Sequence, residues 1–396
     1  MKNAPSLRAP SRALLGAGIV ALTLAPTGAH ALDCDTLPNP VYVTGSGKVI
    51  LAGLGKALAA SGITLVYKLQ GSCLATDAIL AGTKVTSTAT DQAIYWDSTS
   101  ELKCDLPVGG VVATLGISDV FPETCFNLPN GLPSNVHDFF GPVEAYQFVV
   151  PKASTQQSIS HDAAYFVFGF GKDSGVAPWT DEAFMFVRNK DSGTQQMLGA
   201  GIGVPPDKWK GTDAGSSGAI VTAMQTSTNV EATIGILTAE VAGANRASLN
   251  ALAYQDVDQT CGYWPDSTPT SNDKQNVRDG HYPLWGPLHL LTQVDGMGYP
   301  LDPTTKDVVA YITGTKDILS FDLIQLLEEA SIIPTCAMTV QRTSELGALS
   351  SLAPNRACGC RFDELSTGTS SCQKCMSPVD CPASAPACNY GFCEMQ

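Results

Sequence analysis

Apolar residues recur at helical spacing in an early segment of the chain and gather in a short run in the next. Between residues 48 and 60 they share one helix face, at Ile50, Leu51, Leu54 and Leu58, and Ser61-Gly62 predicts the helix end. Residues 63–69 are typical of a strand, and a turn at Gly71-Ser72 leads to a helix over 77–81. Strand, turn and helix in this order predict an α/β fold that binds its ligand where the strands end.

The same order recurs further along the chain. Apolar residues 111–116 precede Ile117-Ser118-Asp119, and apolar residues 183–187 precede a polar segment that begins at Arg188. Residues 164–168 and 232–237 predict two more buried strands, and residues 321–330 predict a late amphipathic helix.

Turn-rich stretches interrupt this pattern. Residues 95–106 and 121–142 are predicted to be loops, and residues 260–279 are polar and predicted to be irregular. After Pro354 seven cysteines crowd together, at Cys358, Cys360, Cys372, Cys375, Cys381, Cys388 and Cys393. A segment this short cannot bury a core of its own, so we expect disulfides to hold it, in preference to a zinc or redox site at Cys372 and Cys375.

The first residues have the pattern of an export signal. Lys2, Arg8 and Arg12 precede a short apolar run over 13–26, and Ala29-His30-Ala31 fits a cleavage site. We therefore expect residues 1–31 to be removed and the protein to be exported, to the periplasm or to the cell surface and beyond. All 13 cysteines follow this segment. Because 13 is odd, we expect one thiol that is free, modified or paired with another chain.

Charge and histidine content narrow the classes of ligand. The formal net charge is −14, which disfavours binding to nucleic acid. The histidines after residue 31 are scattered, so the sequence predicts no metal site. No cofactor-binding motif is recognised, because Tyr42 stands at the first glycine position that a P-loop ending at Lys48 would need.

The most informative segment runs from Arg188 to Thr194. Arg188 ends a predicted strand, and Ser192, Gly193 and Thr194 stand where a helix would begin. A guanidinium binds oxygen pairs in a bidentate way, and helix N-termini present free N–H groups to anions. The segment therefore predicts an oxyanion site, although an isolated arginine here would more simply be a surface ion-pair partner.

Other predicted strand ends add matching groups. Ser46 and Gly47 precede the first helix, Ser72 follows the second strand, and Asp119 follows the third. Phosphate near neutral pH carries a proton that a carboxylate can accept, whereas sulfate carries none and is repelled. Asp119 thus favours phosphate, with the alternative that it only caps a helix starting at Pro122. Ser72 also has the simpler reading of a turn residue.

These segments resemble the phosphate-binding protein of bacterial phosphate import systems over roughly residues 40–340. The matching motifs are Thr44-Gly45-Ser46-Gly47, Gly71-Ser72, Gly116-Ile117-Ser118-Asp119, and Arg188 with Ser192-Gly193-Thr194. Lys190 occupies the position of the family's aspartate, with Asp191 one place later, and Val49-Ile50 replaces the family's Thr-Phe pair. The resemblance implies that Ser46, Gly47, Ser72, Asp119, Arg188, Ser192, Gly193 and Thr194 bind the ligand.

The resemblance also implies a two-lobed, type II periplasmic-binding-protein fold. Lobe I would comprise residues 32–149 and 285–354, and lobe II residues 150–284, followed by a Cys-rich segment over 355–396. The chain would cross outward near 148–151 and return near 282–287. Within that fold we expect disulfides between Cys34 and Cys73 and between Cys104 and Cys125.

Three functions remain open on these grounds. The first is a non-enzymatic solute-binding protein for phosphate or a similar oxyanion, with an ABC transporter permease or a cell-surface component as partner. The second is a surface or matrix interaction protein that keeps the fold, which the Cys-rich segment and Val49 favour. The third is a phosphatase, which would need a nucleophile with a base or a metal. Gly215-Ser216-Ser217-Gly218 lacks the final glycine of a hydrolase elbow, and we expect a flexible turn there.

Overall fold

The computed structural model describes residues 32–318 and 321–395. The expected export signal, residues 1–31, lies outside the described residues. Among the helices that are described, none has the length and apolar character needed to span a membrane.

Lobe I is built on a sheet in which parallel strands alternate with helices. β1 (Pro40–Gly45) lies between β2 (Thr64–Leu69) and β5 (Leu115–Ser118), parallel to both. The helices after these strands are α1 (Lys48–Ala59), α2 (Ser72–Leu80) and α3 (Pro122–Cys125). An apolar core that includes Leu51, Leu54 and Leu65 packs between α1 and the sheet. The strand ends that precede these helices therefore meet at one edge.

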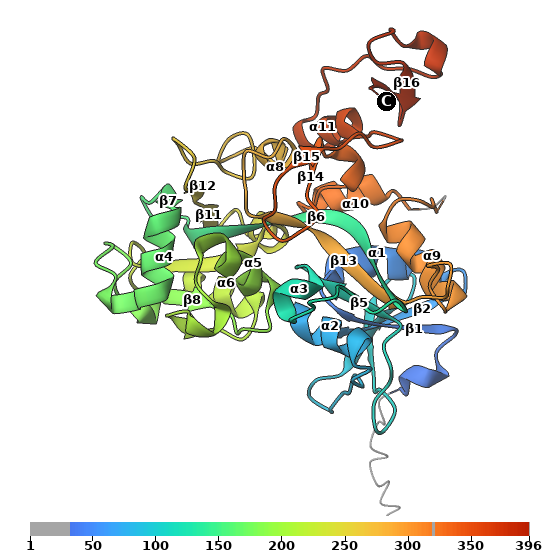
Figure 1. Ribbon diagram of the computed structural model, residues 1–396, viewed down its shortest axis with the longest axis horizontal. Coiled ribbons are helices and arrows are strands. Elements are labelled where there is room, and N and C mark those ends of the chain that lie inside the picture. Colours follow the sequence, from blue (N-terminus) through green and yellow to red (C-terminus); the bar gives the residue numbers. More distant parts are fainter. Residues whose placement is uncertain (1–31, 319–320, 396) are drawn as a thin grey trace, which may run out of the picture. The chain divides into compact units, whose positions relative to one another are not determined.

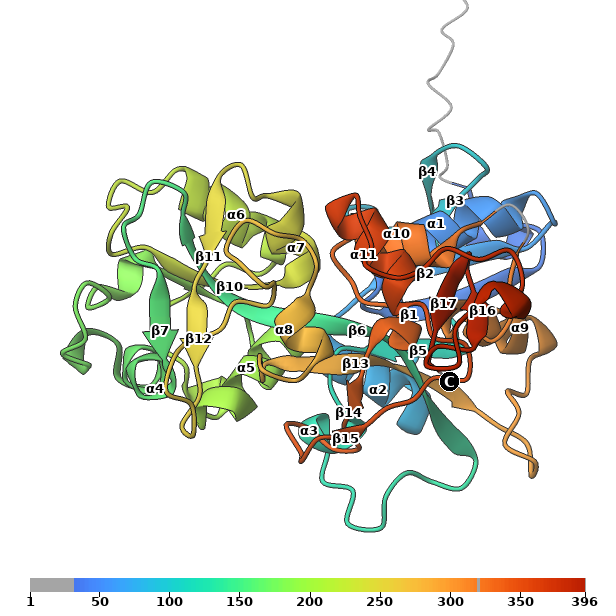
Figure 2. The same ribbon diagram turned by 90° about the horizontal axis from the view of Figure 1, so that it is seen from above.

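Two long strands join the lobes. β6 (Val136–Pro151) pairs with β13 (Trp285–Gln293) as far as Ala145, and then pairs with β10 (Ile234–Thr238) from Tyr146 onward. β13 in turn pairs antiparallel with β5. The resulting strand order is β4 (Glu101–Cys104), β3 (Ala93–Trp96), β2, β1, β5, β13, β6, β10, β8 (Met185–Val187), β9 (Thr212–Asp213). Figure 2 shows β6 running from one lobe into the other. The outward crossing thus starts slightly earlier than expected, whereas Trp285 falls in the range expected for the return.

Lobe II surrounds the far half of β6. Its sheet adds β8 (Met185–Val187), β9 (Thr212–Asp213) and β11 (Leu249–Ala251), and β7 (Ser158–Ser160) pairs with β12 (Ala253–Gln255) beside it. The lobe contains α4 (His161–Phe170), α5 (Gly193–Ile202), α6 (Ser217–Gln225), α7 (Ala239–Ala244) and α8 (Gln275–Arg278). Figure 1 shows α4, α6 and β8 grouped apart from α1, α2 and α9 (Pro303–Ile312) of lobe I. The predicted two-lobed α/β fold of the type II class is confirmed.

Several local predictions of secondary structure are wrong, and the strand expected over residues 111–116 begins only at Leu115. Residues 164–168 form part of α4, because Ala164, Val167 and Phe168 are buried at helical spacing and the Ser160 hydroxyl caps the helix. Residues 95–106 contain most of a hairpin of β3 (Ala93–Trp96) and β4 (Glu101–Cys104), where a loop was expected. Residues 121–142 hold α3 and the start of β6.

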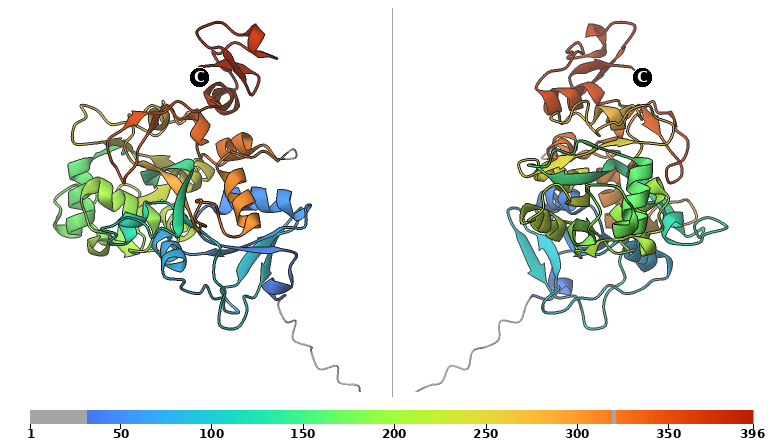
Figure 3. Two further views of the ribbon diagram at one scale, coloured as in Figure 1. Left: turned by 45° about the vertical axis from the view of Figure 1, so that its right-hand side comes forward. Right: turned by 90° about the vertical axis from the view of Figure 1, so that its left-hand side faces the viewer.

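The C-terminal part continues past α10 (Leu323–Glu329). A segment that carries β14 (Val340–Gln341) and β15 (Ser350–Ser351) leads to α11 (Gly359–Thr367) and to the hairpin of β16 (Ala387–Asn389) and β17 (Phe392–Glu394). The expected disulfide-rich character is confirmed, with bonds Cys336–Cys358, Cys360–Cys372, Cys375–Cys388 and Cys381–Cys393. Figure 3 shows the last hairpin at one end of this part of the chain.

Both disulfide pairings expected for lobe I are wrong. Cys34 bonds to Cys104, and Cys73 bonds to Cys125. The backbone explains the first exchange, because Cys34 N donates to Asp105 O at 2.9 Å and so lies beside the end of β4. In the second, α2 and α3 pack together and present Cys73 and Cys125 to each other. Within the described ranges, Cys261 is the one cysteine without a disulfide, and it is exposed.

Candidate functional site

Three helices that start at the facing edges of the lobes have no side-chain cap among the described residues. α1 follows Gly47, α2 follows Gly71, and α5 follows Ser192, whose hydroxyl makes no capping hydrogen bond. By contrast, helices such as α4 and α6 are capped by their preceding serines. Uncapped first turns leave N–H donors for another acceptor, and the helix dipole favours an anion there.

On lobe I, two serines surround the Asp119 carboxyl. The Ser72 hydroxyl accepts from Asp119 N at 3.0 Å and lies 3.4 Å from the Ser46 hydroxyl. Tyr146 holds the loop from β6, because its hydroxyl donates to Asp119 O at 2.8 Å. The Ser46 amide is not free for a ligand, since it donates to Ile117 O at 2.9 Å. Ser46 therefore contributes its hydroxyl to this group and not its backbone donor.

Asp119 does not cap α3. The N-cap position of that helix belongs to Phe121, and no side-chain cap is found there among the described residues. The carboxyl of Asp119 is buried and points toward Ser72 and lobe II. The capping alternative for Asp119 is therefore wrong.

On lobe II, the Arg188 guanidinium is oriented by Ser217. Arg188 Nη1 donates to Ser217 Oγ at 2.8 Å at the start of α6, and Arg188 N donates to Gln195 Oε1 at 2.8 Å. The Nε atom is buried and has no partner in the part of the chain that the structure describes. Asp191 instead bonds to Lys190 Nζ at 2.7 Å. Ser217, rather than an aspartate of the Arg188 segment, thus positions the guanidinium.

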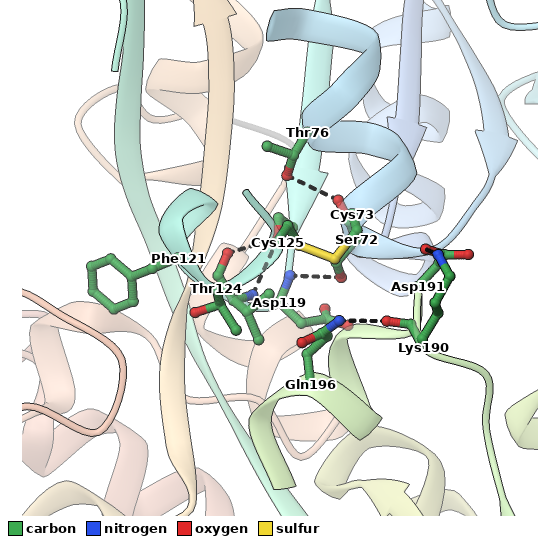
Figure 4. The surroundings of a disulfide bond; sticks show 12 residues. Ser72, Cys73, Thr76, Asp119, Phe121, Thr124, Cys125, Lys190, Asp191 and Gln196 are labelled. Carbon is green, nitrogen blue, oxygen red and sulfur yellow. Dashed lines mark hydrogen bonds and ion pairs between the residues drawn. A yellow bond between two sulfur atoms is a disulfide. The ribbon is translucent and has the colours of Figure 1, made fainter. Parts of the chain in front are cut away.

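The two lobes touch at the first residue of α5. A Cβ at Gly193 would overlap Ser72 Oγ and lie 2.5 Å from Asp119 Oδ2. A second contact joins Cys73 N to Asp191 O at 3.4 Å, where a Cβ at Gly71 would stand 2.8 Å from the Asp191 carbonyl carbon. Figure 4 shows Ser72 and Asp119 beside the Cys73–Cys125 disulfide, with Asp191 and Gln196 opposite them. The lobes are therefore closed upon each other at this point.

Burial and charge act in opposite directions on Asp119. Burial raises the pKa of the Asp119 carboxyl, against hydrogen bonds from Ser46 and Ser72 and the charge of Arg188, which lower it. Burial lowers the pKa of Arg188, and the carboxylates of Asp119 and Asp213 oppose that change. Arg188 and Asp119 thus lie within electrostatic reach of each other on facing lobes.

The structure brings most of the sequence-predicted residues together. Ser46, Ser72, Asp119 and Gly193 contact one another, and Arg188 influences Asp119 through its charge. Gly47 precedes α1, and Ser192 and Thr194 are buried around the start of α5. Within the described residues, no hydrogen bond joins Gly47, Ser192 or Thr194 to Asp119. Their role at the site stays a prediction.

Three residues near the site, Ser217, Glu144 and Glu240, were not predicted from the sequence. Ser217 lies in the Gly215–Gly218 stretch, where the structure has a bend at Gly215 and Ser216 and begins α6 at Ser217. Ser216 Oγ caps this helix by accepting from Ala219 N at 3.1 Å. Glu144 on β6 is 2 % exposed, and its Oε1 accepts from the backbone N–H of Glu240 on α7 at 3.1 Å. A glutamate inside the apolar run of β6 is the signal that could have revealed Glu144.

No protein-family model matches the chain, and no curated protein matches it. Among solved structures, it is similar to a candidate phosphate ABC transporter substrate-binding protein with bound phosphate from Clostridium perfringens, at 12 % identity and a TM-score of 0.49, covering 75 % of this chain and all (100 %) of that chain. An ABC-type phosphate transport receptor from Vibrio cholerae has 16 % identity and a TM-score of 0.47, with 74 % and 99 % of the chains covered.

A third similar structure is the reduced form of the OxyR regulatory domain from Pseudomonas aeruginosa, with 9 % identity, a TM-score of 0.38 and coverage of 69 % and 96 %. The similar structures include transport receptors as well as a regulatory domain, all at low identity and low TM-score. They therefore identify no ligand for this chain. The ligand has to be inferred from the site itself.

Proposed function

We propose that the chain is an exported, non-enzymatic solute-binding protein that holds phosphate or a similar oxyanion between its lobes. The observation that carries this proposal is the meeting of Ser72 and Asp119 of lobe I with Gly193 at the uncapped start of α5. Arg188 and the first turns of α1, α2 and α5 supply donors to one small region. Opening of the lobes would admit the anion, and closure would surround it with these donors.

The composition of the site favours an oxyanion that carries a proton. Asp119 accepts hydrogen bonds when it is ionised, so it can bind a protonated oxygen and repel a bare one. Arg188 offers the charge that offsets the anion, held in place by Ser217. Phosphate meets both requirements near neutral pH. Ser46, Gly47, Ser72, Ser192 and Thr194 would complete the contacts in this proposal.

Isothermal titration calorimetry of the chain from residue 32 onward with inorganic phosphate and with sulfate tests the proposal. We expect phosphate to bind in preference to sulfate, and Arg188→Ala to weaken phosphate binding by about 10- to 100-fold, because a charge-assisted contact contributes about 1.5–3 kcal/mol. Arg356→Ala is the matched control, since Arg356 pairs with Asp317 at the surface. Absence of phosphate binding, or equal effects of the two substitutions, would contradict the proposal.

The second candidate is a surface or matrix interaction protein without high-affinity anion binding. The hydrogen bond from Cys73 N to Asp191 O favours it, because this contact between the lobes occupies a first-turn donor of α2 that the first proposal gives to the anion. The two functions imply different partners, an ABC transporter permease for the first and a cell-surface component for the second. Phosphate titration of the wild-type chain separates them, since only the first predicts saturable binding.

A further inference from the structure

Two carboxyl groups that the oxyanion proposal does not use lie beside Asp119. Glu144 is on β6 opposite Gly286 of β13, and a Cβ at Gly286 would lie 3.8 Å from Asp119 O. Glu240 belongs to the first turn of α7, and its backbone N–H donates to Glu144 Oε1 at 3.1 Å. The end of β5, the crossing strand β6 and the start of α7 thus bring three carboxyl groups to one side of the proposed site.

The nearby basic groups leave these carboxyl groups without an ion pair. Lys48 Nζ pairs with Glu101 at 3.0 Å, and Arg188 Nη1 donates to Ser217. His289 pairs with Asp138 at 2.7 Å. Within residues 32–318 and 321–395, none of Asp119, Glu144 and Glu240 lies within ion-pair distance of a basic group. A buried carboxylate without a cation is costly, so such groups tend to take up protons.

The local charges agree with this expectation. Burial raises the pKa of Glu144 well above its usual range, and the charges of Glu240 and Asp119 raise it further. Burial also raises the pKa of Glu240 to about 7, with Asp119 adding to the increase and Lys48 opposing it. The facing hydroxyls of Tyr67 on β2 and Tyr146 on β6 have pKa values raised by burial, so they stay neutral.

We propose that oxyanion binding takes up a proton from solvent onto the Glu144–Glu240 pair, so that the anion binds more tightly as the medium becomes more acidic. This inference rests on the proposed function. An anion held near Arg188 adds negative charge beside three carboxyl groups, and one proton on the pair relieves that repulsion. By linkage, a proton taken up on binding makes affinity fall as pH rises.

The direction of the pH effect on affinity, and the pH range in which it appears, follow from the titration of Glu240. Below about pH 7 Glu240 is already protonated in the free protein, so its contribution to affinity is constant. Above that pH the free protein loses the proton, and binding must restore it from solvent. One restored proton weakens affinity about tenfold per pH unit until the bound form also ionises.

The test counts protons with inorganic phosphate as the probe. Calorimetry of the chain from residue 32 onward in phosphate-free buffers of differing ionisation enthalpy, from pH 6.5 to 8.5, gives affinity and protons taken up. Phosphate titrates in this range too, so the readout is the difference between wild type and Glu240→Gln. We expect wild type to take up close to one more proton at pH 8 and to lose about fivefold more affinity from pH 7 to 8, because Glu240 of the free protein is still about half protonated at pH 7.

Glu231→Gln is the control, because the Glu231 carboxyl lies in lobe II and accepts from Thr155 and Gln156. Glu144→Gln gives a second measurement of the same pair, should Glu240→Gln not fold. If phosphate binds but both Gln variants match wild type in proton uptake, the inference is overturned while the proposed function stands. If wild type binds no phosphate, both are overturned.

Discussion

Gly193 owes its importance to the absence of a side chain. It is the first residue of α5, and its Cα faces the Ser72 hydroxyl and the Asp119 carboxyl across the lobe boundary. The helix backbone itself tolerates alanine, because Gly193 has no left-handed conformation. A substitution here therefore acts on lobe closure rather than on the helix.

We expect Gly193→Ala to fold normally but to bind phosphate more weakly. The added Cβ overlaps Ser72 Oγ, and overpacking of this kind costs about 1–3 kcal/mol, which corresponds to about 5- to 100-fold in affinity. Gly218→Ala is the matched control, since it lies in the first turn of α6 and its Cβ would meet nothing within 4 Å. Titration calorimetry checks both, and equal affinities of the two variants would refute the closure argument.

Site residues at strand ends could be predicted from the sequence, whereas the residues that contact them could not. Ser72, Asp119 and Arg188 were predicted because turn chemistry after an apolar run marks the ligand edge of an α/β sheet. Ser217 and Glu144 are distant from these residues along the chain, and only the pairing of β6 with β13 and the packing of α6 bring them close. Other long-range contacts, beside the end of β4 and between α2 and α3, decided the disulfide partners of Cys34 and Cys73.

At the scale of elements, the segment Val340–Leu352 acts as a strap across both lobes. Glu345 Oε2 accepts from Phe121 N at 3.0 Å and from Thr124 Oγ1 at 2.9 Å, which fixes α3 of lobe I. Leu346 packs on the core of lobe II, where a Cβ at Gly201 of α5 would lie 3.7 Å from it. One short segment therefore contacts elements on both sides of the proposed site.

Glu345→Ala is expected to loosen α3 without unfolding the protein. Two hydrogen bonds to a carboxylate disappear, and their loss of roughly 1–3 kcal/mol would raise local opening about 5- to 100-fold. Hydrogen–deuterium exchange of a peptide covering residues 121–126 measures this. Glu364→Ala on α11 serves as control, because Glu364 pairs with Lys374 near the surface. Unchanged exchange in Glu345→Ala would show that the strap does not hold α3.

Glu144 gives β6 a pH-dependent stability. Its pKa is raised in the folded state, so the folded protein binds a proton that the unfolded chain releases above about pH 4.5, and stability falls as pH rises toward the folded pKa. In Glu144→Gln an amide oxygen still accepts from Glu240 N, while the titration is absent. Thermal unfolding should show the variant more stable than wild type at pH 8, with the difference shrinking toward pH 5. A pH-independent difference would contradict this account.

Helices and strands were predicted best where the spacing of apolar residues and the turn residues at their ends indicated the same element. The helix over 48–60 and the strand over 63–69 match α1 and β2 closely, because Ser61-Gly62 separates two different spacings. Residues 164–168 were misread because a short apolar run fits a buried strand and a helix equally well. The Ser160 cap and the outward position of Phe166, which is 43 % exposed, decide for the helix.

At the scale of the whole molecule, the Cys-rich segment is joined to the core rather than attached as a separate tail. Cys358 and Phe362 are 0 % exposed and belong to the same apolar cluster as Phe148 and Trp285. Cys358 also bonds to Cys336, and Arg278 ion-pairs with Asp363. The change in composition after Pro354 indicated a separate segment. The sequence does not reveal that Cys358 and Phe362 of this segment pack into the core.

Two truncations distinguish the part of this segment that supports the core from the part that does not. Removal of residues after Pro354 eliminates the Cys336–Cys358 bond and Phe362, and we expect a loss of at least 3 to 5 kcal/mol, roughly the cost of a disulfide or a buried phenylalanine alone. Removal of residues after Gly368, with Cys360→Ala to avoid a free thiol, keeps α11 and both anchors. Beyond that point Met376 and Val379 are more than 90 % exposed, whereas Phe392 and Cys393 are buried and β17 packs on α11, so the longer chain loses only these contacts and not those of Cys358 and Phe362 with the core.

Thermal unfolding and phosphate titration of both truncated chains check this expectation. The longer chain should unfold at a temperature nearer to wild type than the shorter chain does. It should bind phosphate with unchanged affinity, because residues 369–395 contact neither Asp119 nor Arg188 through any hydrogen bond or ion pair in the described structure. The shorter chain should unfold at a clearly lower temperature. Equal unfolding temperatures would mean that Cys358 and Phe362 add little to the core. Lost phosphate binding already in the longer chain would instead assign the residues after Gly368 a part in holding the lobes.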